Sequence, residues 1–182
     1  MAKLKKSSKD AVGRLAALRA QLKLAKLDGF IVPYADEHQN KFLPPRAERL
    51  AWLTGFTGSA GLAVILADEA AVFVDGRYTL QVRAQVDGDL YSYHHLIDEP
   101  VTGWLEKNLS KSMRLGYDPW LHSVRGVECT RKACDKAEAE FVAVEANPVD
   151  AVWSDQPPSP QTPIVPHELR FAGRASTEKR QE

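Results

Sequence analysis

The glycine-rich loop at residues 55–61 is the first stretch whose residue types suggest chemistry. Its glycines stand at positions 55, 58 and 61, so the spacing is not the G-x-G-x-x-G of dinucleotide-binding loops, and no Gly-Lys-Ser/Thr follows. The sequence around Ser59 is Thr-Gly-Ser-Ala-Gly, which lacks the first glycine of the G-x-S-x-G nucleophile elbow. We therefore interpret the loop as a tight connection between a helix and a strand, in which glycine permits a positive φ angle.

Two groups of residues could in principle bind a metal. Asp36, Glu37 and His38 are consecutive in a polar, irregular stretch, and we interpret them as a solvated loop. His94 and His95 are adjacent in an expected strand, where neighbouring side chains point to opposite faces, so both cannot bind one ion. No His-Glu-x-x-His motif occurs. We expect no catalytic residue and no metal ligand in this chain.

Arg77 is the strongest candidate for contact with a ligand. It follows Asp75-Gly76 at the end of an apolar run, and the carboxyl end of a buried strand is where α/β sheets place ligand-contacting groups. The same arginine could instead pair with Asp75 or with the end of a helix. The sequence leaves both interpretations open.

The elements that must position these residues are strands alternating with helices. Residues 62–67 and 70–74 are short, continuous apolar runs, which is typical of strands buried on both faces. The alternation predicts an α/β fold with a mixed sheet flanked by helices. A first helix is expected from an N-cap at Asp10 to a stop at Gly29. The remaining expected strands are 30–32, 90–94, 114–117 and 141–144, and the remaining helices are 46–53, 78–86, 101–109, 123–139 and 147–153.

Composition divides the 182 residues into four segments. Residues 1–9 are expected to be a flexible N-terminus and 10–154 the α/β domain. Residues 155–166 form a proline-rich linker, since five of the eleven prolines lie between 157 and 166. Residues 167–182 then resemble the start of a truncated second domain. We expect the chain to be a piece of a longer protein.

Charge and hydropathy limit the partners. The chain has 24 Lys plus Arg and 24 Asp plus Glu, and this zero net charge argues against nucleic acid as a main partner. No apolar run approaches the roughly 20 residues that cross a bilayer, so no membrane partner is expected. Cys129 and Cys134 are five residues apart in an expected helix and so lie on different faces, where neither a bridge nor a metal pair is expected. These features predict a cytoplasmic protein.

Several motifs coincide in order along the chain. They are Asp36-Glu37-His38-Gln39-Asn40, residues 49–61 (RLAWLTGFTGSAG), Val74-Asp75-Gly76-Arg77-Tyr78, Gly116-Tyr117-Asp118-Pro119 and residues 147–153 (NPVDAVW). As a set they resemble the N-terminal domain of the cytosolic-type Xaa-Pro aminopeptidases (aminopeptidase P) of the creatinase/prolidase superfamily. Residues 166–173 (PHELRFAG) look like the opening of that family's second domain.

The resemblance implies a ribonuclease H-like first domain of a dimeric, three-domain metalloaminopeptidase. The family releases the N-terminal residue from peptides with proline second, using two divalent ions, usually manganese, in a third domain that lies downstream of this chain. The implied partners are that downstream domain, a proline-containing peptide and a second copy of the protein. The implied role of Arg77 is substrate contact, while the chain alone is expected to be inactive, shaping the substrate cleft and supporting dimerisation. Two alternatives remain: a peptide- or protein-binding module of a catalytically inactive relative, and the N-terminal domain of a creatinase or prolidase.

Overall fold

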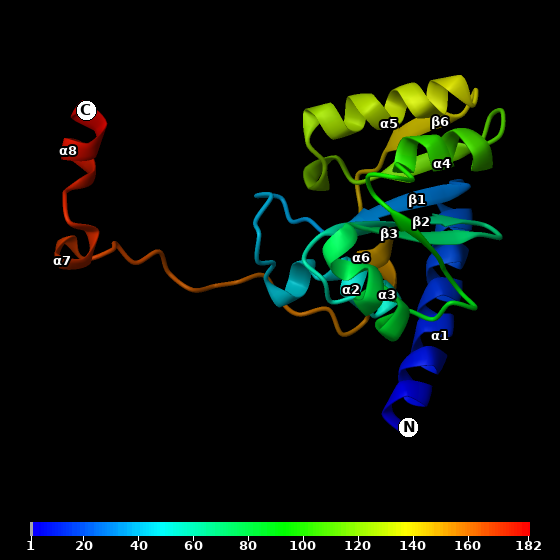
Figure 1. The fold of residues 1–182 in the computed structure, drawn as a ribbon, viewed down its shortest axis with the longest axis horizontal. Coiled ribbons are helices and arrows are strands. Elements are labelled where there is room, and N and C mark those ends of the chain that lie inside the picture. The colour runs from blue at the N-terminus through cyan, green and yellow to red at the C-terminus, as the bar shows by residue number, and fades with distance from the viewer. Residues whose placement is uncertain (1) are drawn as a thin grey trace.

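A six-stranded mixed sheet forms the centre of the computed structural model, which describes residues 2–182 (Figure 1). The strand order is β4-β3-β2-β1-β5-β6. Strand β2 pairs antiparallel with β1 and β3, and all other pairs are parallel. Five strands therefore run in one direction and β2 runs against them. The strands are β1 (Gly29–Pro33), β2 (Gly61–Leu66), β3 (Ala70–Val74), β4 (Ser92–His95), β5 (Arg114–Tyr117) and β6 (Glu140–Ala143).

The helices cover both faces of this sheet, as Figure 1 shows. One face carries α1, α2, α3 and α6, and the other carries α4 and α5. The helices of the body are α1 (Ala2–Leu24), α2 (Arg49–Thr54), α3 (Thr79–Gln85), α4 (Val101–Asn108), α5 (Val124–Lys136) and α6 (Pro148–Val152), with 3₁₀ turns η1 (Pro45–Ala47), η2 (Gly76–Tyr78) and η3 (Pro119–Leu121). The mixed α/β architecture predicted from the sequence is confirmed, with most boundaries within three residues of those expected.

Two hydrophobic cores explain why the central strands are apolar throughout. Phe30 and Val32 of β1 pack into the core beneath α1 and α2, whereas Ile31 packs into the core beneath α4 and α5. Every residue of β3 is buried. A strand covered on both faces cannot place polar side chains on either, so its sequence shows a continuous apolar run and no alternation.

The first helix differs from the prediction at both ends. It begins at Ala2, so the N-cap expected at Asp10 is wrong. Residues 2–9 contain no glycine or proline to stop a helix, and alanine, leucine and lysine favour one. At the other end α1 stops at Leu24, and Lys26 adopts a left-handed φ of 56°.

Gly29 does not end that helix but opens β1. A Cβ atom at Gly29 would lie 2.4 Å from Leu66 Cδ2 and 2.9 Å from the carbonyl oxygen of Ile65. The glycine is therefore required by the close approach of β1 to β2, a contact between residues far apart in sequence that no local pattern reveals.

Residues beyond α6 extend away from the sheet (Figure 1). Residues 157–168 form no helix or strand, and the short helices α7 (Leu169–Ala172) and α8 (Ser176–Gln181) contain no buried residue. The boundaries 155–166 for a linker and 167–182 for a second domain stay predictions.

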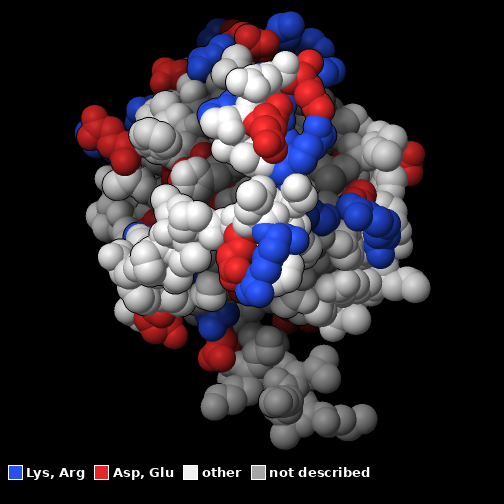
Figure 2. All heavy atoms as spheres, turned by 90° about the vertical axis from the view of Figure 1, so that its left-hand side faces the viewer, with Lys and Arg blue, Asp and Glu red and all other residues white. Residues whose placement is uncertain are grey.

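The surface carries charges of both signs. Figure 2, in which the left-hand side of Figure 1 faces the viewer, shows Lys/Arg and Asp/Glu side chains interspersed. None of the helices in residues 2–182 is long and apolar enough to cross a membrane.

Candidate functional site

The polar residues of interest lie beyond the carboxyl ends of the parallel strands, and we call this end of the sheet its carboxyl edge. Because β1 and β3 run in the same direction, the residues that follow them, Tyr34 and Asp75, emerge at one edge. Strand β2 enters the sheet at this same edge, since Gly61 pairs with Val74, and this places Ser59 there as well. Sheets of this type bind ligands beyond the carboxyl ends of their parallel strands.

Arg77 lies in the turn η2 directly after β3. Its backbone N–H donates to Asp75 Oδ1 over 3.0 Å, which caps the turn. Its guanidinium also donates hydrogen bonds to the Asp75 carboxylate, from Nε at 3.1 Å and from Nη2 at 2.5 Å. The Arg77 side chain is nevertheless 63% exposed. Of the two interpretations left open by the sequence, the pairing with Asp75 is therefore present, and contact with a ligand stays a prediction.

The ion pair also changes the protonation of both partners. The hydrogen bond from Arg77 is the largest effect on Asp75 and holds the pKa of its carboxyl below the ordinary value. The same contact raises the pKa of Arg77. Asp75 is therefore a fixed anion that orients the guanidinium, which is how an arginine fork is held ready for a second partner.

A chain of three side chains lies beside Arg77, and the sequence did not predict it. Lys41 Nζ donates to Ser59 Oγ over 2.9 Å, and Ser59 Oγ lies 2.7 Å from Tyr78 Oη. The hydrogen bond with Ser59 is the main cause of a lowered pKa at Tyr78, and the charges of Arg77 and Lys41 act in the same direction. The guanidinium carbon of Arg77 is 5.2 Å from the centre of the Tyr78 ring. Four polar side chains thus form one cluster.

Only part of this cluster was visible to sequence reasoning. Tyr78 belongs to the Asp-Gly-Arg-Tyr motif and Ser59 to the glycine-rich loop, but nothing in their spacing joins them. Lys41 stands 18 residues before Ser59 in an irregular loop. Its backbone carbonyl accepts a hydrogen bond from Tyr34 Oη at 3.1 Å, which ties that loop to the end of β1.

Asp36 contradicts the expected solvated loop. Its residue is 1% exposed, and its carboxylate accepts hydrogen bonds from the backbone N–H groups of His38 and Asn40 and from Asn40 Nδ2. Burial raises the pKa of this carboxyl, but the hydrogen bonds from Asn40 and His38 outweigh it and lower the pKa overall. The buried Asp36 carboxylate therefore stabilises its own loop through these hydrogen bonds, while Glu37 and His38 are exposed as expected.

The two adjacent histidines each pair with a separate carboxylate. His94 Nδ1 lies 2.5 Å from Glu99, and His95 Nδ1 lies 3.0 Å from Asp98. The His94 ring also stacks on Phe73, with 5.0 Å between ring centres. Within the described part of the chain no three His, Cys, Asp or Glu side chains are grouped so that they could hold a metal ion.

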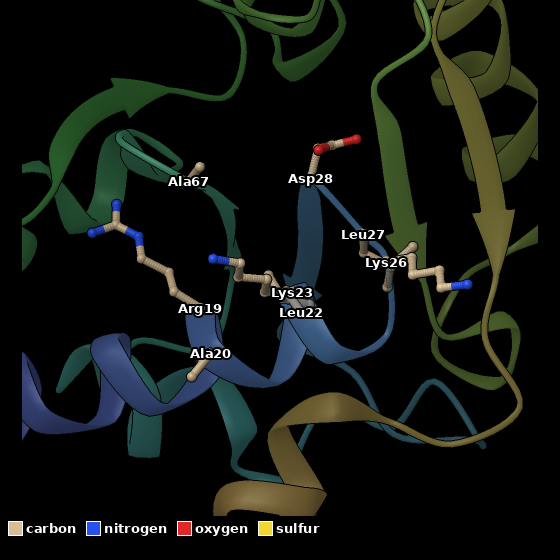
Figure 3. Close-up of a pocket in the computed structure, with 8 residues that line it drawn as sticks. All are labelled: Arg19, Ala20, Leu22, Lys23, Lys26, Leu27, Asp28 and Ala67. Atoms are coloured by element: carbon tan, nitrogen blue, oxygen red, sulfur yellow. The ribbon is translucent and has the colours of Figure 1, made fainter.

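A hollow lies at the opposite end of the sheet, beside the amino end of β1 (Figure 3). It has a volume of about 630 Å³ and is lined by Arg19, Lys23 and Lys26, with Leu22 and Leu27 among its apolar residues. Figure 3 shows the Lys26 side chain turned away from the other two cations. Of these basic residues Lys23 lies in the last turn of α1, where a cation interacts favourably with the helix dipole, and Lys26 lies beyond the end of the helix. The hollow is remote from Arg77 and contributes nothing to the cluster there.

The cysteines lie as the sequence predicted, on different faces of α5. Cys129 is exposed and Cys134 is buried, and both are free. Burial raises the pKa of the Cys134 thiol to about 11. It packs as an apolar side chain in the core beneath α4 and α5.

Comparison with known proteins establishes the class to which this fold belongs. Residues 14–152 match the model of the creatinase/prolidase N-terminal domain family, so the chain belongs to that family. The N-terminal domain of the cytoplasmic peptidase PepQ from Mycobacterium tuberculosis has the same fold, with a TM-score of 0.59 and 23% identity over 76% of this chain and 97% of that one. The fold class predicted from the sequence is confirmed.

Within that family the more similar proteins are Xaa-Pro aminopeptidases. Human Xaa-Pro aminopeptidase 2 is 37% identical over 166 residues, which is 91% of this chain and 25% of the relative. Aminopeptidase P1 of Arabidopsis thaliana is 36% identical over 84% of this chain and 24% of its own length. An X-prolyl aminopeptidase from Caenorhabditis elegans, described as a cytosolic enzyme with a di-nuclear active site, has a TM-score of 0.84 and 27% identity over 94% of this chain and 30% of its own. The chain thus spans about a quarter of the length of these curated relatives.

Proposed function

We propose that this chain is the non-catalytic N-terminal domain of a metal-dependent Xaa-Pro aminopeptidase, which releases the N-terminal residue from peptides whose second residue is proline. The observation that supports it best is the similarity to the Caenorhabditis elegans enzyme, which extends over 94% of the chain and so includes part of the tail beyond residue 152. The curated relatives with 37% and 36% identity, human Xaa-Pro aminopeptidase 2 and Arabidopsis thaliana aminopeptidase P1, are also aminopeptidases, which favours an aminopeptidase parent over a creatinase or prolidase.

The chemistry is assigned to the segment that follows in the relatives. The described residues hold no group that fits a metal ion, so the two divalent ions, proposed to be manganese, would be bound downstream. When bound they would supply Lewis-acid activation of water or the peptide carbonyl. A homodimeric, cytoplasmic protein is part of the same proposal. It rests on the family resemblance, and on the cytosolic description of the Caenorhabditis elegans relative.

The contribution proposed for this domain is one wall of the substrate cleft, with Arg77 in contact with the peptide. Two features support that role: the guanidinium is 63% exposed, and Asp75 fixes its orientation through the fork-like pair. An arginine held in this way can donate two further hydrogen bonds to a carbonyl or carboxylate. Because Asp75 already restricts the side chain, this binding costs less conformational entropy.

The test uses the full-length protein that contains this chain. We expect it to release the N-terminal residue from Xaa-Pro peptides and not from matched Xaa-Ala peptides, to lose that activity on metal chelation, and to regain it with manganese. A downstream segment that binds no metal and cleaves no peptide would overturn the proposal in favour of a binding module. Cleavage of Xaa-Pro dipeptides alone would instead identify a prolidase.

A further inference from the structure

The cluster of Lys41, Ser59 and Tyr78 beside Arg77 has more hydrogen-bond donors than its own acceptors use. We propose that it binds the terminal carboxylate of a short peptide substrate and so sets the substrate length that the parent enzyme prefers. This inference rests on the proposed function, which assigns substrate contact to Arg77 alone. It adds a second cation, Lys41, and two hydroxyl groups.

The count of donors supports a negatively charged ligand. An ammonium group has three N–H donors and no acceptor, and Lys41 uses one of them on Ser59. Ser59 and Tyr78 share one hydrogen bond between two hydroxyl groups, so one hydroxyl hydrogen is left over whichever of them donates. Because Ser59 already accepts from Lys41, it can donate to Tyr78, and the Tyr78 hydrogen then points outward. A relay of this kind polarises each successive hydroxyl group.

The charges around the cluster leave its second cation unmatched. Asp75 is held by Arg77, and the Asp36 carboxylate is satisfied by its own loop. Among the side chains of residues 10–182, none forms an ion pair with Lys41. Lys41 and Arg77 together therefore carry one positive charge more than Asp75 neutralises. A carboxylate provides both the missing charge and the missing acceptors, whereas a carboxamide provides only a weak acceptor.

The surroundings hold the donors in place. The Tyr78 ring packs edge-on against the buried Phe56, with 5.6 Å between ring centres, and the guanidinium carbon of Arg77 lies 5.2 Å from the centre of the Tyr78 ring. The hydrogen bond from Tyr34 to the Lys41 carbonyl fixes the loop that carries the lysine. Donors that are ordered before the ligand arrives cost less entropy on binding.

The experiment compares Xaa-Pro peptides of two to five residues that end in a carboxylate or in an amide, using the full-length protein. We expect one length at which KM is about tenfold lower for the carboxylate form. Lys41→Gln and Tyr78→Phe should reduce that KM ratio to about one. The matched control is Lys23→Gln, which removes the same charge at the opposite end of the sheet and should leave the ratio unchanged.

Failures of the two proposals are distinguishable. A KM ratio near one at every length, or a ratio that survives both substitutions, overturns the carboxylate site even though the enzyme cleaves its peptides. Normal kinetics in Arg77→Ala would instead overturn the role assigned to Arg77. If no peptide is cleaved, the proposed function fails, and the same peptide pairs still report on the site by calorimetry, where equal Kd values for the two forms overturn it.

Discussion

Replacing Arg77 by alanine should damage catalysis and spare the fold. The substitution removes the guanidinium but keeps the backbone N–H that donates to Asp75 Oδ1 over 3.0 Å, so the cap of the turn η2 survives. Asp75 loses its partner, but its side chain is 23% exposed and water can replace the lost hydrogen bonds. An ion pair this exposed contributes little to stability, and we expect Tm to stay within about 2 °C of wild type.

The expected loss of activity follows from the hydrogen bonds that the guanidinium can make. Charge-assisted hydrogen bonds to a substrate are the stronger class, and loss of such a contact lowers kcat/KM roughly ten- to a hundred-fold. Arg77→Lys should fall between wild type and alanine, because lysine keeps the charge and loses the planar fork. The measurement is kcat/KM on an Xaa-Pro peptide with the full-length protein, together with Tm by differential scanning calorimetry.

Arg49 provides the matched control for a purely structural arginine. It forms a two-pronged pair with Asp150, at 2.7 and 2.8 Å, and its side chain is only 10% exposed. Arg49→Ala removes this buried side chain and its packing between α2 and α6, and it leaves Asp150 with only the hydrogen bond from Gln156 Nε2 at 2.8 Å, which should cost about 3 kcal/mol. Tm should then fall by roughly 6–12 °C while kcat/KM per folded molecule is retained.

The two variants should therefore show opposite patterns. If Arg77→Ala lowers Tm as Arg49→Ala does, and loses activity only in proportion to unfolded protein, Arg77 has a structural role and the reasoning from its exposure is wrong. Full activity in a stable Arg77→Ala protein would refute substrate contact directly.

Three further predictions concern the stability and reactivity of the domain. The lowered pKa of Asp36 means that its carboxylate stabilises the fold above about pH 4 and that this contribution is lost as pH falls through the folded-state pKa. Asp36→Asn should lower the free energy of unfolding at pH 7 by about 1–3 kcal/mol and flatten its decline in acid, as measured by urea denaturation across pH; an unchanged acid profile would contradict this. Cys129 should react with a thiol reagent in the native protein while Cys134 reacts only in denaturant, and rapid modification of both would show that the core beneath α5 is open. Gly29→Ala should destabilise by about 1–3 kcal/mol because the added Cβ meets the neighbouring strand. Its control, Gly13→Ala, has open space around it within α1 and should stabilise by about 0.5–1 kcal/mol, so equal effects would contradict the packing argument.

The sequence by itself determined the class of fold and the family. The short apolar runs at 62–67 and 70–74 predicted strands covered on both faces, and they form β2 and β3 of the central sheet. Ser123 and Asn147 were placed at the starts of expected helices, and each caps one, by accepting from the backbone N–H of Gly126 and Val149. Such features are visible because periodicity and capping depend on residues within one or two turns.

Predictions from local sequence patterns failed where the role of a residue depends on the surrounding fold. Gly29 was assigned to a helix end, yet its role is set by Leu66 on the adjacent strand. Asp36 was placed in solvent because its neighbours are polar, yet its loop folds around it and removes it from water. The start of α1 was set at Asp10 because a good capping residue was present, although nothing before it breaks a helix.

Only the tertiary structure assembled the candidate site. Arg77 was identified from its position after a buried strand, but Lys41 and Ser59, which join its neighbour Tyr78 in the cluster, come from the connection between β1 and β2. They meet because β2 runs against β1 and β3, so that the end of β3 and the connection between β1 and β2 lie at the same edge of the sheet. Strand direction and order arise from the packing of the whole core, and no short window of sequence contains that information.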